Sequence, residues 1–392
     1  MAEQSRYPQG RRSFLGLVGA AALSLVLAAC QPTARPQPQP GPAQPEQPAP
    51  LPNLPRDDTR NRVAVLVPMT GANAGVGTSI ANAANLALLD TGGERIRITV
   101  YDTAKAGALA AANEAIADGN RLFLGPLLAE DALAIAPVAR GAHIPVITFS
   151  NDTNVTGAGV YQIGFTPDQS ITRVVSYARE KGVQRFAALI PQGVYGRRAS
   201  QAVIAAVEHG GGRMIAMQEY DRNPASIRSA VARLNAQGGF DAILIADGAQ
   251  SAAGAAAVVK AGPGAAARIL GTELWSTESG LAQFAALRGA WFASASDSMF
   301  NQLRTRYRTR YGKNPYRLAS LGYDAVLLSV RIAANWPIGK NFPERALLDP
   351  GGFTGVDGPF RFRQDGVAER ALQVQQVDAG GLTVVSPAPK GF

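Results

Sequence analysis

The chain lacks cysteine almost entirely and has little histidine for its length of 392 residues. Cys30 is the single cysteine, and His143 and His209 are the two histidines. A disulfide framework is therefore excluded, and residues 57–392 contain no thiol for a metal site or a nucleophile. The serine patterns Gly-x-Ser-x-Gly and Ser-x-x-Lys are absent as well. We therefore expect a protein that is not an enzyme and has no catalytic residue. We also expect no metal site and no cofactor.

The N-terminal apolar run is too short to cross a bilayer. Residues 14–29 are apolar or small, but sixteen residues fall short of the ~20 that a membrane-spanning helix needs. Arg11 and Arg12 precede the run and small residues lead up to Cys30, which is the order of an export signal. The paired arginines resemble a twin-arginine signal, and Leu-Ala-Ala-Cys resembles the lipobox of lipoproteins. We expect a signal peptide at 1–29 and lipidation of Cys30, with either the twin-arginine or the general export route.

Residues 30–56 comprise Cys30 and a proline-rich linker. Residues 31–56 hold ten of the 26 prolines, separated mainly by glutamine and alanine. Such a segment favours polyproline II and, at ~3.1 Å per residue, reaches up to ~80 Å. It is either a passive tether or a site of peptide recognition. Because Gln31 follows Cys30 where an aspartate would favour inner-membrane retention, we expect a periplasm-facing anchor, with the outer membrane favoured.

Acidic residues are outnumbered by basic residues, 29 to 38. The net charge is +9, or about +7 without residues 1–29 and their three arginines and one glutamate. Much of the excess lies at residues 304–317, where Tyr307 and Tyr311 separate arginines. A solvent-exposed helix face is one interpretation, and contact with anionic lipid or an acidic partner is the other. Export from the cytoplasm argues against nucleic acid as a partner.

Residues 57–392 alternate short apolar runs with alanine-rich helical patterns. Runs of this kind predict parallel strands that are buried on both faces. A first series of strands begins at Arg62 and ends near Phe149, and a second runs from Phe186 to Leu270. The pattern therefore predicts two α/β units, one for each series of strands.

Small and polar residues follow the predicted strands, at the edge where doubly wound sheets bind ligands. After the first strand, Gly71, Gly75 and Gly77 lack the lysine of a phosphate-binding loop. Close approach of a helix N-terminus explains these glycines as well as a nucleotide does. Two such edges facing each other would form a cleft lined by hydroxyls, amides and a few carboxylates.

Several short segments, in their order along the chain, resemble the type I periplasmic binding proteins of the leucine-isoleucine-valine branch. They are Val65 to Gly71, Gly125-Pro126, Ile144 to Ile147, Tyr195-Gly196, Tyr323-Asp324-Ala325, Gly355 to Pro359 and Asp365-Gly366. The resemblance implies a two-lobed fold with three crossovers, each lobe a parallel sheet with helices on both faces. It places lobe one at 57–165 plus 295–335, and lobe two at 166–294 plus 336–392.

The same resemblance implies ligand contacts. In the amino-acid receptors of this family an acid of the second lobe holds the ligand's amine, and a threonine after the fourth strand helps to hold its carboxylate. Glu273 and Thr153 match these positions, and Tyr195 matches a frequent aromatic contact. The full set of cleft candidates is Thr70, Glu130, Asn151, Asp152, Thr153, Tyr195, Asp247 and Glu273.

Departures from the receptor pattern favour another branch. The loop after the third strand carries Glu130 and Asp131 where the receptors offer hydroxyls, and these carboxylates would repel an anionic ligand. Its Gly-Pro-Leu-Leu segment is more similar to the penicillin-binding protein activator lipoproteins. The first hypothesis is therefore a membrane-anchored activator or scaffold of a peptidoglycan synthase. The alternative is a receptor that delivers branched-chain or other amino acids to an ABC permease.

Overall fold

The computed structural model describes residues 59–278 and 280–392. These described residues belong to one compact unit. The predictions for the signal peptide, for Cys30 and for the proline-rich linker lie outside the described residues. Within the described part of the chain, no helix is both long enough and apolar enough to cross a membrane.

The first sheet is parallel and has the strand order β2-β1-β3-β4-β5. Its strands are β1 (Asn61–Val67), β2 (Ile96–Asp102), β3 (Leu122–Leu124), β4 (Val146–Thr148) and β5 (Val160–Gln162). The helices in its two cores are α1 (Ala74–Asp90), α2 (Ala108–Ala117), α3 (Ala129–Gly141), α8 (Asp297–Tyr311) and α9 (Ala319–Ala333).

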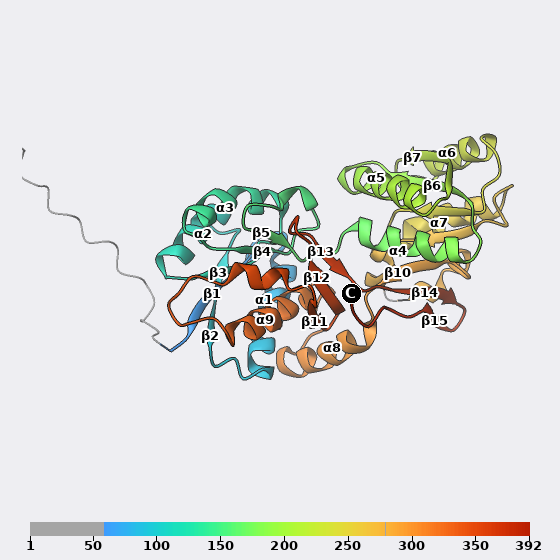
Figure 1. Ribbon diagram of the computed structural model, residues 1–392. Coiled ribbons are helices and arrows are strands. Elements are labelled where there is room, and N and C mark those ends of the chain that lie inside the picture. Colours follow the sequence, from blue (N-terminus) through green and yellow to red (C-terminus); the bar gives the residue numbers. More distant parts are fainter. Residues whose placement is uncertain (1–58, 279) are drawn as a thin grey trace, which may run out of the picture. The chain divides into compact units, whose positions relative to one another are not determined.

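Side chains of β1 alternate between these two cores. Val63 and Val65 share a core with α1 and α9, whereas Ala64 and Leu66 share a core with α2 and α3. Figure 1 shows these two pairs of helices on either side of the sheet. Successive side chains of a strand point to opposite faces, so a strand that is covered on both sides must be apolar throughout. The continuous apolar run of the sequence is explained by this burial.

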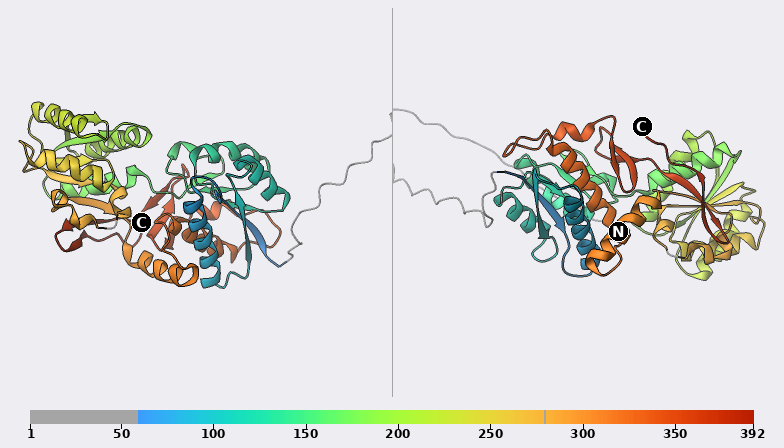
Figure 2. Two further views of the ribbon diagram at one scale, coloured as in Figure 1. Left: turned by 180° about the vertical axis from the view of Figure 1, so that it is seen from behind. Right: turned by 90° about the horizontal axis from the view of Figure 1, so that it is seen from below.

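The second sheet has the order β15-β14-β10-β9-β8-β6-β7. Its strands are β6 (Arg185–Pro191), β7 (Arg213–Tyr220), β8 (Ala242–Ile245), β9 (Arg268–Gly271), β10 (Trp291–Ser294), β14 (Gln373–Asp378) and β15 (Gly381–Ser386). Helices α4 (Pro167–Glu180) and α5 (Val194–His209) share a core with one face, and α6 (Pro224–Ala236) and α7 (Ala249–Lys260) share a core with the other. Figure 2 shows the strands between these two helical layers. The predicted α/β fold, with parallel sheets flanked by helices on both faces, is confirmed, and β14 and β15 extend the second sheet as antiparallel strands.

A small antiparallel sheet does not lie in the lobe that the predicted domain bounds assign to it. It consists of β11 (Phe353–Gly355), β12 (Gly358–Phe362) and β13 (Ala368–Arg370). We expected all of 336–392 in the second lobe, but Trp336, Phe353 and Phe360 are buried in the core that contains β1 and α9. These aromatic side chains add apolar area to the first core, whereas β14 and β15 join the second sheet.

The chain passes between the two sheets three times. It leaves the first sheet after β5, returns after β10 and crosses again after β13. The crossovers bring residues from both sheets and from the small antiparallel sheet close together. They position the candidate site.

Candidate functional site

A cavity of about 390 Å³ lies at the three crossovers. Phe165 and Thr166 contribute from the first crossover, Ala295 from the second and Leu372 from the third. Residues that follow the parallel strands β1, β3, β4 and β9 supply much of the remaining lining, as expected for ligand sites of doubly wound sheets. A cavity of this size falls in the range of small-molecule sites.

Much of the cavity wall is apolar. Leu127 and Leu128 come from the loop after β3, and Phe149 follows β4. Leu274 and Leu318 contribute from other elements of the fold. Such a wall favours a ligand with an apolar body because burial of apolar surface is the main driving force for binding.

Glu273 supplies a carboxylate to this wall. It opens a short 3-10 helix, Glu273–Thr277, directly after β9. The Ser170 hydroxyl donates to its Oε2, and the Tyr195 hydroxyl lies 3.0 Å from its Oε1. Burial raises the pKa of the Glu273 carboxyl, while the hydrogen bonds from Ser170 and Tyr195 oppose that rise. A cation in the cavity would stabilise the charged form further.

Packing behind Glu273 fixes its position. The Trp275 side chain is fully buried, and its Nε1 donates to the backbone oxygen of Asp247 at 2.9 Å. Glycine is required at position 271 because a Cβ there would lie 2.4 Å from the Trp275 ring. Packing against the Trp275 indole therefore fixes the conformation of the turn after β9.

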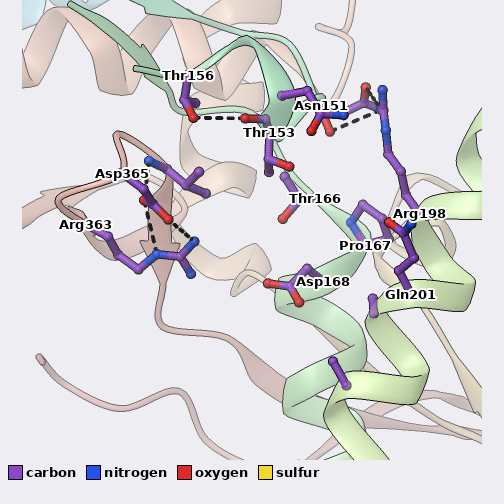
Figure 3. A pocket seen from close by; sticks show the side chains of 14 residues that line it. Asn151, Thr153, Thr156, Thr166, Pro167, Asp168, Arg198, Gln201, Arg363 and Asp365 are labelled. Atoms are coloured by element: carbon purple, nitrogen blue, oxygen red, sulfur yellow. Dashed lines mark hydrogen bonds and ion pairs between the residues drawn. The ribbon is translucent and has the colours of Figure 1, made fainter. Parts of the chain in front are cut away.

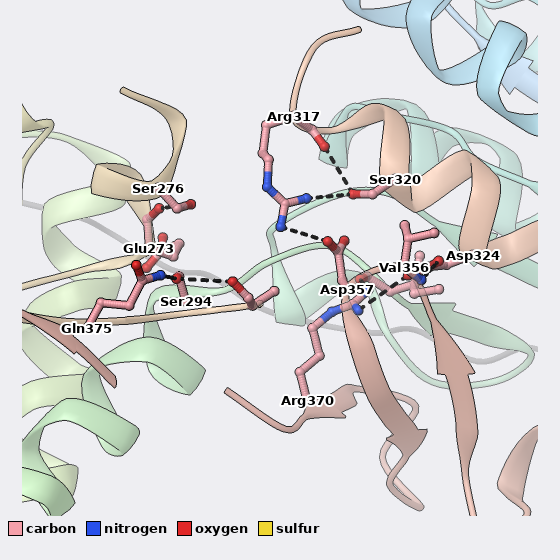
Figure 4. Close-up of polar contacts among 12 residues, drawn as sticks. Glu273, Ser276, Ser294, Arg317, Ser320, Asp324, Val356, Asp357, Arg370 and Gln375 are labelled. Carbon is pink, nitrogen blue, oxygen red and sulfur yellow. Dashed lines mark hydrogen bonds and ion pairs between the residues drawn. The ribbon is translucent and has the colours of Figure 1, made fainter. Parts of the chain in front are cut away.

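Arg317 supplies a cation to the same cavity. Its side chain is only 9% exposed, and its Nη2 lies 2.6 Å from Oδ1 of the fully buried Asp357 (Figure 4). Its Nη1 donates to Ser320 Oγ at 3.0 Å, and its guanidinium stacks 4.2 Å from the Phe300 ring centroid. Burial acts to lower the pKa of Arg317, but Asp357 and other nearby carboxylates raise it overall.

The sequence analysis missed this role for Arg317 because it grouped the residue with the basic segment 304–317. The structure separates it from that segment, since α8 ends at Tyr311 and Gly312 follows with a φ of 72°. Gly312 and Pro315 are the sequence signals that could have predicted the break. The preceding Arg304 and Arg308 are exposed on α8.

Three of the predicted cleft residues come together at or beside the cavity. Asn151 and Glu273 line it, and Tyr195 contacts Glu273. Thr153 instead lines a neighbouring cavity of about 430 Å³, which shares Asn151 and Thr166 with the first (Figure 3). Its position suits a ligand that extends beyond the first cavity, rather than one held within it.

The remaining predicted residues make other contacts. Thr70 donates to Asp102 Oδ2 at 2.8 Å, and Asp152 forms an ion pair with Arg198. The Asp247 carboxylate accepts from Tyr220 and from Arg222. Glu130 is exposed in the first turn of α3, where a carboxylate suits the positive end of the helix dipole. None of these side chains is among the described residues that line the 390 Å³ cavity.

Comparison with solved structures identifies the fold. A protein from Rhodospirillum rubrum, assigned to a branched-chain amino acid ABC transporter, is 21% identical with a TM-score of 0.72, over 83% of this chain and 100% of that chain. LivJ from Streptococcus pneumoniae, in complex with isoleucine, is 17% identical with a TM-score of 0.60, over 84% and 100%. A solute-binding protein from R. palustris, in complex with 4-hydroxybenzoate, is 19% identical with a TM-score of 0.63, over 84% and 98%.

Sequence comparison gives a relative and a family. A Rickettsia prowazekii (strain Madrid E) protein, described as uncharacterized, is 27% identical over 174 residues, which are 44% of this chain and 47% of that protein. The chain thus spans about half the length of this curated relative. The profile of the periplasmic binding protein family matches residues 61–381. The chain therefore belongs to the periplasmic binding protein family and has its type I, two-lobed fold.

Proposed function

We propose that the protein is the solute receptor of an ABC transporter and binds an amino acid with an apolar side chain. The observation that carries the proposal is the Glu273 carboxylate in a largely apolar cavity wall. The Ser170 hydroxyl contacts one of its carboxylate oxygens and the Tyr195 hydroxyl contacts the other. The arrangement suits an ammonium group because a desolvated carboxylate gains most from an opposite charge.

The apolar wall accounts for the rest of such a ligand. Leu127, Phe149 and Leu274 offer contacts to an aliphatic or aromatic side chain. Burial of each methylene group contributes about 0.8 kcal/mol, so side chains of increasing apolar size should bind more tightly until the cavity is full. Asparagine and serine should bind weakly by the same reasoning.

The related structures support transport rather than synthase activation. LivJ binds isoleucine, and its fold matches this chain over 84% of the length. The activator hypothesis was motivated by Glu130 and Asp131, by the Gly-Pro-Leu-Leu segment and by the long proline-rich tether. Glu130 is exposed, and that loop contributes Leu127 and Leu128 to the cavity. An ABC permease is therefore the proposed partner, and a lipid anchor at Cys30 would hold the receptor on the periplasmic side of a membrane.

Thermal unfolding of the purified protein with each of the twenty amino acids tests the proposal. A ligand at 100 times its Kd should stabilise the folded state by about 2.7 kcal/mol. Glu273→Gln should weaken binding of the best ligand by about 30-fold or more, since loss of one partner from a buried charge pair costs at least about 2 kcal/mol. The control Glu130→Gln alters an exposed carboxyl outside the cavity and should bind as tightly as the unmodified protein.

Absence of stabilisation by all twenty amino acids would overturn the receptor proposal. Crosslinking in envelope extract separates the two hypotheses further. Specific capture of a peptidoglycan synthase, together with no amino-acid binding, would restore the activator hypothesis. Binding that is equal in Glu273→Gln and Glu130→Gln would remove Glu273 from the site.

A further inference from the structure

A cluster of four buried charges lies beside the cavity. Arg317 and Asp357 form one ion pair, and Arg370 Nη1 lies 3.8 Å from Asp324 Oδ2 (Figure 4). The side chains of Asp324, Asp357 and Arg370 are fully buried, while Arg317 lines the cavity. Arg317 is therefore the member of the cluster that a ligand in the cavity can meet.

The hydrogen bonds of the cluster are incomplete. Arg317 Nε, Arg370 Nε and Arg370 Nη1 are buried without a hydrogen-bond partner among the described residues, and so are the carboxylate oxygens Asp324 Oδ2 and Asp357 Oδ2. Buried guanidinium nitrogens normally have partners, because an unmet donor away from water costs free energy. The cluster thus holds unmet donors and unmet acceptors, and Arg317 is its one member in the described cavity lining.

Arg317 keeps its charge beside the cavity, whereas burial weakens the other charges of the cluster. Burial first, and repulsion by Asp357 next, raise the pKa of Asp324 to about 7. Burial also lowers the pKa of Arg370, and it raises the pKa of Asp297, a carboxyl at the start of α8 near Arg317. Nearby carboxylates raise the pKa of Arg317 itself, so this side chain remains a cation in the cavity wall.

Hydroxyl donors for a ligand carboxylate are missing where the receptor pattern places them. The loop after β3 presents Leu127 and Leu128 to the cavity, and Thr153 lines the neighbouring cavity. Arg317 is the cationic side chain in the described lining. A guanidinium is the side chain best suited to a carboxylate, because its planar donors match the two oxygens.

The geometry points to Arg317 as a specificity-determining residue that binds the ligand's carboxylate. This inference rests on the proposed function, in which Glu273 binds the ligand's ammonium group. The ligand is then a zwitterion that lies between Glu273 and Arg317, with its apolar part against the leucine and phenylalanine wall. Ligands that lack the carboxylate are rejected because they offer no charged acceptor to the Arg317 guanidinium.

Matched ligands test the inference without any mutation. The amino acid that stabilises the protein most strongly is compared by calorimetry with its amide, which keeps the ammonium group and loses the carboxylate charge. The amide should bind at least about 30-fold more weakly. Equal binding of acid and amide would overturn the role of Arg317 and leave the proposed function intact. No binding by any amino acid would overturn both.

A double variant then assigns the effect to Arg317. Arg317→Met with Asp357→Asn removes one charge of each sign, so that no lone buried carboxylate is left. This variant should bind acid and amide within about threefold of each other, whereas the exposed control Arg304→Met should discriminate fully. Retained discrimination in the double variant would overturn the inference. If the double variant does not fold, Arg317→Lys replaces it, and undiminished binding of the acid by Arg317→Lys would contradict a role for the planar guanidinium.

Discussion

Asp324 should make the folded protein less stable as the pH rises. Its carboxyl is fully buried, and its Oδ1 accepts from the Val356 backbone at 2.7 Å. Burial is the main cause that raises its pKa from 3.8 to about 7, with Asp357 adding to the effect. Because the folded-state pKa lies above the unfolded value, the folded chain keeps a proton in a range where the unfolded chain has lost it.

The size of the effect follows from that difference. Each pKa unit corresponds to about 1.4 kcal/mol, so the full contribution is at most about 4 kcal/mol. Stability from this group is present below about pH 4 and is lost progressively as the pH rises through about 7. Asp324→Asn is the matched variant, since its amide oxygen can still accept from Val356 and its charge is absent at every pH.

Urea unfolding of the unmodified protein and of Asp324→Asn at pH 5, 6, 7 and 8 measures the effect. The difference in unfolding free energy between the two proteins should shift in favour of the variant by about 1 kcal/mol per pH unit between pH 5 and 7, and level off above pH 7. Parallel stability profiles over the whole range would refute the assignment of a raised pKa to Asp324.

Two further predictions concern the support of the site. Tyr195→Phe should weaken ligand binding roughly tenfold, because it removes the hydroxyl that lies 3.0 Å from Glu273 Oε1. Calorimetry checks this, and unchanged affinity would show that the hydroxyl does not orient the carboxylate. Gly196→Ala should lower the unfolding temperature by several degrees, because its Cβ would lie 1.7 Å from the Pro191 oxygen. Gly254→Ala on α7, which meets open space, should leave the temperature unchanged or raise it. Equal unfolding temperatures for the two variants would contradict the packing at Gly196.

The fold could be predicted from the sequence because its strands are buried on both faces. Apolar runs such as Arg62–Val67 mark such strands directly, and the structure places β1 at Asn61–Val67. Local sequence patterns were sufficient to predict residues whose environment is determined by a single helix or strand.

Residues whose role depends on several elements could not be placed. Thr153 starts a short 3-10 turn in which Asp152 accepts from the Asn154 backbone, and this turn places it at the neighbouring cavity. Arg317 is buried by Phe300 and Asp357, which lie on separate elements. No window of sequence contains these contacts. Tertiary packing therefore decides which polar residues reach the site.

Calorimetric titration with an amino acid and with its analogue that lacks the amino group tests the central claim most directly. Leucine and 4-methylpentanoate form one such pair. Glu273 should bind the ammonium group, so the analogue should bind about 30-fold more weakly or worse to the unmodified protein, and this difference should disappear in Glu273→Gln. Equal affinity of the two compounds for the unmodified protein would contradict the account.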